Sequence, residues 1–466
     1  MENSNYPNKL KSIAKDLSEY IKVIDDKKSL IKFVLSKAKE KKLNIILIND
    51  CYYIKNQEAK AVLHLNISDK INGSSFINIK DGEDFSIETN LNITEISGIL
   101  NIILLLEEKI SNFDILLTNN FINDYNRDFS ILRSVIRSKN IINLNLNESN
   151  CIAESFASYT LSTVEIPIER TEISENKFLE ENYIYRISLN DVVGNNYTAD
   201  INNVFKNSTK MLMTFLRKIK SKVDLDVIEI KGGAKFDSIP YISYVDIACK
   251  KEFENDLLDV FNLFVSEYLS TNLRIEPNLK FEIEKINSLK FYPMTQESYE
   301  HISSFVELAL NGTYSVDSNT KTAISSSTLA RSSTSSNKLN IVMIFRSLSE
   351  ESLNQMIEKT KLASNINGGK FINRLEIPSW QNSNDELSKI FKSTYDYLFK
   401  SNLEIIKTQY SLDCNLIFYK FDVNMISIGV KYKQVDIKKS ASDFKDILKT
   451  FSLIREVLFR LNKSLE

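Results

Sequence analysis

The sequence has very little histidine and glycine for its length. Only two of its 466 residues are histidine, although histidine is the commonest metal ligand and the usual general base near neutral pH. It has 10 glycines, where average usage of about 7% would give roughly 30. Glycine forms the tight turns that bring backbone close to bound ligands. These shortages argue against a rich catalytic site and favour a protein that has kept its architecture.

Long apolar runs and clustered cysteines are also missing. The longest apolar run, residues 99–106, is interrupted by Asn101 and is too short to span a bilayer. The first residues contain no apolar core of a secretory signal. The four cysteines have no Cys-x-x-Cys spacing, which predicts reduced, buried thiols and neither a disulfide framework nor a zinc knuckle (Cys51, Cys151, Cys249 and Cys414). We therefore expect a cytoplasmic protein without membrane insertion.

The chain also lacks an excess of positive or negative charge. The formal net charge is −2, which gives no support to binding of nucleic acid or anionic membranes. A small basic patch near the C-terminal end is typical of a solvated face, with docking of an acidic partner as the alternative (Lys431, Lys433, Lys438 and Lys439). Hydrophobic residues make up 43% of the chain, enough for the large cores of several domains.

The first part of the chain alternates helical and strand patterns. Apolar residues recur at helical spacing over residues 8–40, which predicts two helices. Short β-rich runs follow (LNIILIND, CYYIKN and AVLHLNIS), then a helix over residues 94–109 and strands over residues 113–118 and 141–147. This alternation favours an α/β layer.

From about residue 160 the pattern becomes α+β. Strand patterns (YIYRISLNDVV, VDLDVIEIKGG, YISYVDIACK and LNIVMIFRSL) are interspersed with helical patterns over residues 204–221, 252–269 and 349–364. The Ser/Thr-rich stretch at residues 325–336 is typical of a flexible loop. After Trp380 the α/β pattern returns, with helices over residues 386–400 and 441–464. This order predicts one domain inserted within another.

Four fragments of the second half carry a specific signal. They are IKGGAKFDSIP (residues 230–240), IVMIFRSLSEESL (341–353), IPSWQNSNDEL (377–387) and MISIGVKYK (425–433). In this order and spacing the chain resembles the bacterial Xaa-His dipeptidase (aminoacyl-histidine dipeptidase) family of two-zinc metallopeptidases. That family has a Gly-Gly…Ile-Pro turn, an Ile-Arg-Ser strand end, a Tyr-Pro-Gly-Trp segment and a Ser-Ile-Gly-Pro loop at comparable positions.

The resemblance implies a fold and a mechanism to look for. It implies a zinc-peptidase-like α/β catalytic domain made of residues 1–160 and 383–466, with an inserted α+β lid or dimerisation domain of residues 161–382. In the family, histidines and carboxylates bind two metals, and a carboxylate general base activates the bridging water. Such metals lower the pKa of bound water from about 15.7 to about 7 and polarise the scissile carbonyl.

The family's metal ligands are replaced at the positions that match its motifs. The His-x-Asp pair falls on Asn66 and Ser68, the bridging aspartate on Thr94, the paired glutamates on Phe121 and Ile122, the next aspartate on Asn145, the lid histidine on Asn196, and the last histidine near Asp436. Neutral amide and hydroxyl groups are weak ligands for zinc. The resemblance therefore implies a degenerate site with no catalytic residue and no metal cofactor.

A few residues near this site keep recognisable chemistry. Sliding the register by two would put His64 at the histidine position, although a packed or surface histidine is the favoured interpretation. Arg346 and Asp413 are the candidates for a residual cleft. Arg346 either orients backbone or pairs with an acid at the domain junction, or it recognises a substrate carboxylate, and both interpretations stay open. His301 has no carboxylate or thiol at metal spacing, which favours a surface position.

Three functions follow as hypotheses. The first is a catalytically inactive dipeptidase-fold protein that acts as a binding or scaffold component of a larger assembly, with a protein partner, a second copy or an active paralogue. The second is an active metal-dependent dipeptidase with a shifted metal site. The third is a peptide- or amino-acid-binding module without turnover, which predicts thermal stabilisation by its ligand.

Overall fold

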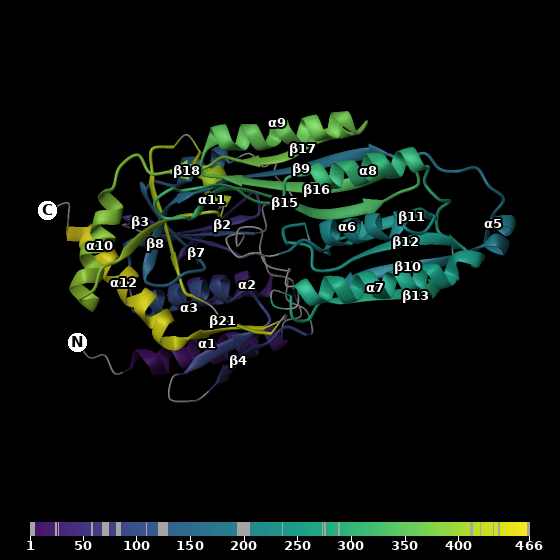
Figure 1. The fold of residues 1–466 in the computed structure, drawn as a ribbon. Coiled ribbons are helices and arrows are strands. Elements are labelled where there is room, and N and C mark those ends of the chain that lie inside the picture. The colour runs from purple at the N-terminus through teal and green to yellow at the C-terminus, as the bar shows by residue number, and fades with distance from the viewer. Residues whose placement is uncertain are drawn as a thin grey trace. The chain divides into compact units, whose positions relative to one another are not determined.

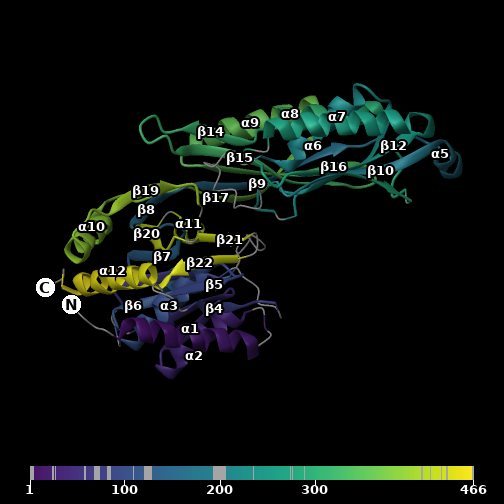
Figure 2. The same ribbon diagram turned by 60° about the horizontal axis from the view of Figure 1, so that its bottom comes forward.

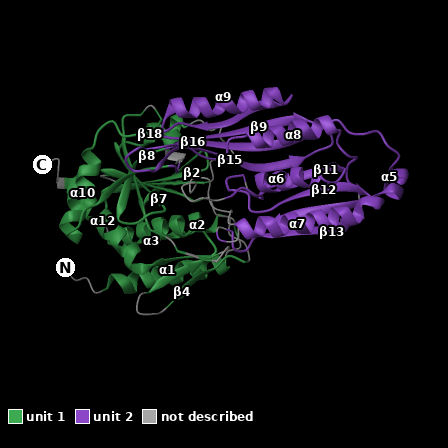
Figure 3. Cartoon of the chain, viewed as in Figure 1, with its two compact units in different colours: residues 1–156, 380–408, 412–466 green, residues 157–379, 409–411 purple. Residues whose placement is uncertain are grey.

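The chain folds into two compact units (Figure 3). The computed structural model describes residues 5–23, 26, 28–56, 59–67, 74–80, 85–108, 110–119, 129–192, 206–234, 236–272, 274, 276–287, 289–410, 413–419, 421–431, 433–436 and 439–463. Unit 1 comprises residues 1–156, 380–408 and 412–466, and unit 2 comprises residues 157–379 and 409–411. The boundaries expected from the sequence, after residues 160 and 382, lie close to these divisions.

Unit 1 is built on a nine-stranded mixed sheet (Figure 1). Its strands are β1 (Asn44–Ile48), β2 (Cys51–Lys55), β3 (Ala61–Asn66), β6 (Phe113–Thr118), β7 (Asn140–Leu146), β8 (Cys151–Phe156), β18 (Trp380–Gln381), β19 (Glu404–Thr408) and β20 (Asn424–Gly429). The order is β1-β2-β6-β3-β7-β20-β8-β18, with β19 paired to β8. Strands β6, β3, β7 and β20 are parallel neighbours. Their carboxyl ends therefore share one edge of the sheet.

Helices and a second, small sheet complete unit 1. The helices are α1 (Tyr6–Val23), α2 (Ser29–Glu40), α3 (Ile93–Glu107), α4 (Ser130–Val135), α10 (Glu386–Phe399), α11 (Asp413–Phe418) and α12 (Phe444–Lys463). The small sheet holds β4 (Ile77–Lys80), β5 (Ser86–Thr89), β21 (Lys433–Asp436) and β22 (Lys439–Asp443). Helix α3 is buried along nearly its whole length and packs against α1, α12, β3 and β7 (Figure 2). Its all-round apolar sequence explains this central position.

Unit 2 is a nine-stranded sheet covered by helices. Its strands are β9 (Ser158–Pro167), β10 (Asn182–Asn190), β11 (Leu225–Gly232), β12 (Ser243–Lys250), β13 (Lys280–Ile286), β14 (Gly312–Val316), β15 (Ala323–Thr334), β16 (Lys338–Ser347) and β17 (Lys370–Ile377). Its helices are α5 (Glu175–Glu181), α6 (Ser208–Lys220), α7 (Glu254–Asn272), α8 (Gln296–Leu308) and α9 (Glu350–Ile366), with a short 3₁₀ helix, η3 (Lys251–Phe253). All the strand pairs of this sheet are antiparallel. The predicted class, an α/β domain with an inserted α+β domain, is confirmed.

The prediction of a flexible loop at residues 325–336 is wrong. This stretch forms most of β15, which pairs with β11, β14 and β16 and is largely buried. The Thr334 hydroxyl shows why a polar composition fits a buried strand: it donates to the Ile230 carbonyl and accepts from the Ile230 amide, at 2.9 Å each. Short hydroxyl side chains can bond to a neighbouring strand, so composition alone misled the prediction.

No described helix is long and apolar enough to cross a membrane.

Candidate functional site

The candidate site lies at the carboxyl ends of the parallel strands of unit 1. In open α/β sheets this edge is where ligands and catalytic groups usually gather. Asn66 is the last residue of β3, Thr118 is the last residue of β6, and Asn145 is the second-to-last residue of β7. The structure thus brings together Asn66 and Asn145, two of the positions at which the sequence analysis expected lost metal ligands.

A single amide, that of Asn143, is the centre of this site. Its Nδ2 contacts His64 Nδ1 at 2.8 Å and donates to Asn145 Oδ1 at 3.1 Å. Its Oδ1 accepts hydrogen bonds from the Asn145 backbone N–H at 3.0 Å and from Ser427 Oγ at 2.5 Å. Both donor and both acceptor positions of the Asn143 amide are therefore used.

A second amide, that of Asn145, joins β7 to the end of β3. The Asn66 backbone N–H donates to Asn145 Oδ1 at 2.9 Å, and Asn145 Nδ2 donates to the Asn66 carbonyl at 2.9 Å. Backbone pairing between β3 and β7 reaches only His64 and Asn143. The Asn145 side chain therefore continues the ladder past the point where backbone pairing stops.

His64 lies inside this arrangement and is fully buried. Its Nε2 lies 3.0 Å from Thr118 Oγ1, and Thr118 Oγ1 donates to Asn66 Oδ1 at 3.3 Å. The Asn145 backbone N–H can only donate, so it fixes Asn143 Oδ1 as an acceptor and turns Asn143 Nδ2 toward the ring. His64 Nδ1 must then accept, which leaves the ring proton on Nε2, directed at Thr118.

Thr94 is used at the start of helix α3. Asn92 is the N-cap, and its Oδ1 accepts from the Thr94 backbone N–H at 3.0 Å and from Thr94 Oγ1 at 2.7 Å. Such a cap satisfies helix amides that would otherwise lack partners. The next residue, Glu95, is a buried carboxylate whose Oε1 lies 3.4 Å from Asn92 Nδ2. Thr94 thus donates to the N-cap of α3 through both its backbone N–H and its hydroxyl.

The remaining predicted site residues are only partly described. Ser68, Phe121, Ile122 and Asn196 lie outside the described residues. Asp413 begins α11, and Asp436 ends β21, where its backbone is paired with that of Lys439. The replacement of the paired glutamates by Phe121 and Ile122 therefore stays a prediction.

Comparison with known proteins gives one curated relative and many structures of one fold. No protein-family model matches the chain. The cytosol non-specific dipeptidase of Escherichia coli is 22% identical over 251 residues, which are 53% of this chain and 51% of that protein. The chain thus spans about half the length of the curated relative that it matches.

The structural similarity extends over the whole chain. The aminoacylhistidine dipeptidase of Vibrio alginolyticus superposes with a TM-score of 0.64 and 15% identity, covering 98% of this chain and 97% of that one. This protein has the fold of the aminoacylhistidine dipeptidases. The resemblance predicted from four sequence fragments is confirmed. Human carnosine dipeptidase 1 is more distant, with 7% identity, 98% coverage of both chains and a TM-score of 0.49.

The described residues of this dipeptidase-fold site do not fit a pair of catalytic metals. Zinc binds imidazole, thiolate or carboxylate, whereas the site offers two amides at the strand ends and one imidazole whose Nδ1 lone pair already accepts a hydrogen bond. Within the described ranges there is also no group of three or more His, Cys, Asp or Glu side chains that could hold a metal ion. No step through a metal can be assigned to these residues.

Unit 2 holds the other predicted residue with distinctive chemistry, Arg346. Its guanidinium is 1% exposed, and Nη2 donates to both carboxylate oxygens of Asp237, at 3.1 and 3.2 Å. Nη1 donates to the Gln409 carbonyl at 3.2 Å, and the guanidinium carbon lies 4.7 Å from the ring centre of Tyr159. Asp237 belongs to the GGAKFDSIP fragment. Arg346 thus binds a carboxylate of its own chain.

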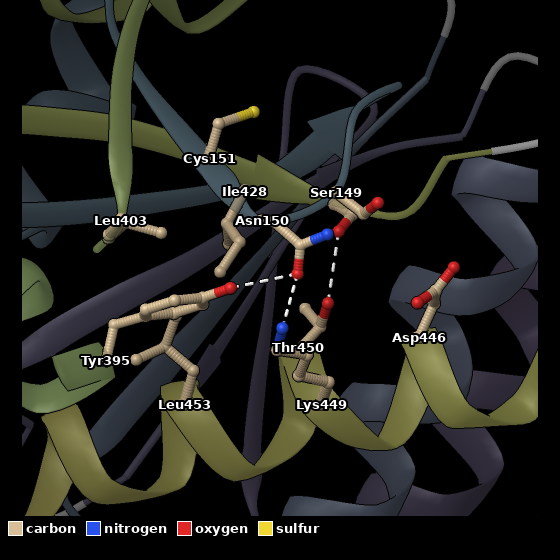
Figure 4. A pocket seen from close by; sticks show the side chains of 11 residues that line it. Ser149, Asn150, Cys151, Tyr395, Leu403, Ile428, Asp446, Lys449, Thr450 and Leu453 are labelled. Atoms are coloured by element: carbon tan, nitrogen blue, oxygen red, sulfur yellow. Dashed lines mark hydrogen bonds between the residues drawn. The ribbon is translucent and has the colours of Figure 1, made fainter. Parts of the chain in front are cut away.

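A small pocket of unit 1 lies next to the start of β8 and the end of β20 (Figure 4). Asn150 Oδ1 accepts hydrogen bonds from Tyr395 Oη and Lys449 Nζ there, and Thr450 Oγ1 donates to the Gly429 carbonyl at 3.0 Å. The cavity volume of about 10 Å³ is room for about one water molecule. The pocket is too small for a dipeptide.

The basic patch near the C-terminal end is partly neutralised. Lys431 lies 3.9 Å from Glu148, and Lys433 lies 3.2 Å from Asp443. Lys438 lies outside the described residues. The Lys431 and Lys433 side chains are both exposed, as expected for a solvated face.

Three members of the site were not recognised from the sequence. Asn143, Thr118 and Ser427 are all fully buried, with no measurable exposure. The available signal was a polar residue inside an otherwise apolar strand, as in IINLNLN and MISIG. That signal is weak because it does not say which residues meet.

Proposed function

We propose that this protein is a catalytically inactive protein of the dipeptidase fold that acts as a binding or scaffold component of a larger assembly. The observation that carries the proposal is the set of neutral amides and hydroxyls at the carboxyl ends of β3, β6 and β7. A fold and its active site impose separate demands on the sequence, so the fold can persist when the chemistry is lost.

Peptide hydrolysis by two metals needs groups that the described site does not supply. It needs ligands that hold the metals, a Lewis acid beside the carbonyl, and a base that takes a proton from water. An asparagine amide is not a base near neutral pH, and its nitrogen has no lone pair for a metal. The Asn145 side-chain amide moreover bonds to the backbone N–H and carbonyl of Asn66, and Asn66 Oδ1 accepts from Thr118 Oγ1.

The environment of Arg346 supports a role other than capture of free peptides. A guanidinium that recognises a ligand carboxylate must be open to that ligand, whereas the Arg346 side chain is buried and paired with Asp237. We therefore favour binding of a protein partner over the hypothesis that the cleft binds a free peptide. The partner is a second copy of this chain, an active paralogue or another protein, and the assembly is cytoplasmic.

Metal content and peptide hydrolysis test the proposal. The full chain is purified without a polyhistidine tag or chelator, loaded with zinc, manganese or cobalt, desalted and analysed by plasma mass spectrometry. The same preparation is incubated with a set of dipeptides, beside the E. coli cytosol non-specific dipeptidase treated in the same way. We expect substoichiometric metal and no hydrolysis above a no-protein blank, while the control enzyme cleaves.

Two metals per chain with dipeptide turnover would overturn the proposal and establish the shifted-site enzyme. Metal-free protein that is stabilised by dipeptides without cleaving them would favour the binding module instead. Size-exclusion chromatography with light scattering then distinguishes a self-assembled scaffold from a single chain that needs another partner.

A further inference from the structure

We infer that six side chains, four of them fully buried and two half-buried, form a permanent structural cross-link, which holds the carboxyl ends of four strands together at the place where related folds would need metal ligands. We call this set the amide network; it consists of His64, Asn66, Thr118, Asn143, Asn145 and Ser427. It goes beyond the proposed function because it assigns a positive role to these residues rather than a missing one.

The network joins the four neighbouring parallel strands β6, β3, β7 and β20. His64 and Asn66 come from β3, Thr118 from β6, Asn143 and Asn145 from β7, and Ser427 from β20. The sheet order β6-β3-β7-β20 places these strands side by side. The hydrogen bonds described above within the network, apart from those between Asn143 and Asn145, therefore each link two different strands.

Every hydrogen-bonding position of the Asn143 side-chain amide is occupied by a partner within the protein. Asn143 donates twice and accepts twice, so a metal or water could bind it only by displacing an existing partner. Buried partners are costly to displace because water cannot replace them. A network with every central position filled is typical of a rigid structural element.

Backbone groups fix the direction of the hydrogen bonds. Two backbone N–H groups, of Asn145 and Asn66, donate to Asn143 Oδ1 and Asn145 Oδ1 respectively. A backbone N–H can donate a hydrogen bond but cannot accept one. Neither the Asn143 nor the Asn145 side-chain amide can therefore flip without losing a hydrogen bond. The fixed amide of Asn143 then holds His64 as the tautomer with its proton on Nε2, so the imidazole serves as a strand link and offers no lone pair to a cation.

The two histidines of the chain make the network directly observable. In full-length protein with ¹⁵N-labelled histidine, long-range ¹H–¹⁵N spectra at pH 7.5 contain two rings, and a His301→Gln variant identifies that of His64. We expect the Nε2–H tautomer for His64. We also expect neither a tenfold excess of zinc chloride nor EDTA to shift its signals or the Tm of the protein.

A matched pair of variants tests the cross-link itself. Asn143→Leu removes the central amide and leaves its partners unpaired, which we expect to lower Tm by about 5 °C or more. Asn101→Leu is the control because Asn101 is equally buried and its Oδ1 has no hydrogen-bond partner among the described residues. We expect this control to change Tm by less than about 2 °C.

An Nδ1–H tautomer, a zinc-dependent shift of the His64 signals, loss of Tm in EDTA, or equal stability of the two variants would each overturn the inference. If Asn143→Leu does not fold, the ring spectra of the unmodified chain decide alone. Dipeptide hydrolysis by a protein with an unperturbed His64 ring would defeat the proposed function and leave this inference standing.

Discussion

Arg346 is buried and contacts its own chain. It lies at the strand end where the resemblance suggested recognition of a substrate carboxylate, yet its Nη2 donates to both carboxylate oxygens of Asp237 in the same unit. A buried ion pair gains little over an apolar pair of similar size, but removing one partner leaves an uncompensated buried charge. The pair therefore constrains both residues together.

We predict that Arg346→Met destabilises the protein by about 3 kcal/mol or more, because Asp237 is left without its cation. The measurement is the shift of the thermal unfolding transition, and the double variant Arg346→Met/Asp237→Leu should recover part of the loss. The exposed pair of Lys139 and Asp422, with 72% and 76% side-chain exposure, is the control. Lys139→Met should shift the unfolding transition far less than Arg346→Met, because an exposed ion pair is screened by solvent. Equal losses at the two sites would contradict the structural role of Arg346.

Cys151 gives a prediction about alkaline pH. Burial, followed by the nearby charges of Glu148 and Glu404, raises the pKa of the Cys151 thiol to about 12, above an unfolded-chain value of about 8.5. Between these values the unfolded chain binds fewer protons than the folded one, so the stability contribution present at neutral pH is lost as pH rises through this window.

The expected result is that Cys151→Ala loses Tm less steeply than the unmodified protein between pH 9 and 11, measured in matched buffers. Site-resolved alkylation should also label Cys151 only after denaturation, because the thiolate is the reactive form. Parallel pH profiles, or rapid labelling of the native chain at pH 8, would contradict the assignment.

At the scale of elements, the patterned helices and strands were predictable and β15 was not. The pattern over residues 94–109 predicts α3, and FDILLT coincides with β6, because apolar periodicity reports burial directly. The serines and threonines of β15 carry no such signal. Their burial depends on β11 and β16, which pair with them across the sheet.

We predict that the amides of residues 326–334 exchange slowly with solvent, because this largely buried stretch pairs with β16 along its length, with β14 at residues 326–327 and with β11 at residues 332–333. Hydrogen exchange followed by mass spectrometry of peptic peptides measures this protection. Peptides from β14, which pairs only with β15 at the side of the sheet, provide an internal comparison. Exchange of residues 326–334 within seconds would restore the loop interpretation.

At the scale of the whole molecule, the chain crosses between its units more often than a simple insertion requires. After residues 380–408 of unit 1, residues 409–411 belong to unit 2. Gln409 Nε2 donates to the carbonyls of Ala323 and Ile324 at 2.9 and 2.8 Å, and its own carbonyl accepts from Arg346. One glutamine thus ties a late segment of the chain into the sheet of unit 2.

We predict that Gln409→Leu lowers Tm by about 3 °C or more, because two buried carbonyls and the Ser326 hydroxyl lose a partner. Differential scanning calorimetry of the full chain is the measurement. The control is Gln381→Leu, which changes an exposed glutamine of β18. If the Gln409→Leu variant unfolds at the same temperature as the control, the Gln409 side chain does not stabilise the attachment of residues 409–411 to unit 2.

The candidate site was predictable only in part. Aligned motifs led to Asn66, Thr94 and Asn145 as neutral replacements, because a missing carboxylate is visible in a sequence. They did not reveal Asn143, Thr118 or Ser427, which the family motifs do not mark. The contacts among these residues join positions as far apart as Asn143 and Ser427, and no local pattern encodes such a pairing.

The sequence by itself determined the fold class, the order of most elements and the chemical identity of the groups at the positions where the family motifs predict metal ligands, because periodicity and residue type are local properties. The tertiary structure decided what those groups do. Parallel strand order brings β3, β6, β7 and β20 to one edge, and only there do the amides complete each other's hydrogen bonds. It also turned Arg346 toward Asp237 and buried the serines of β15, because burial and partner choice depend on residues far away in the chain.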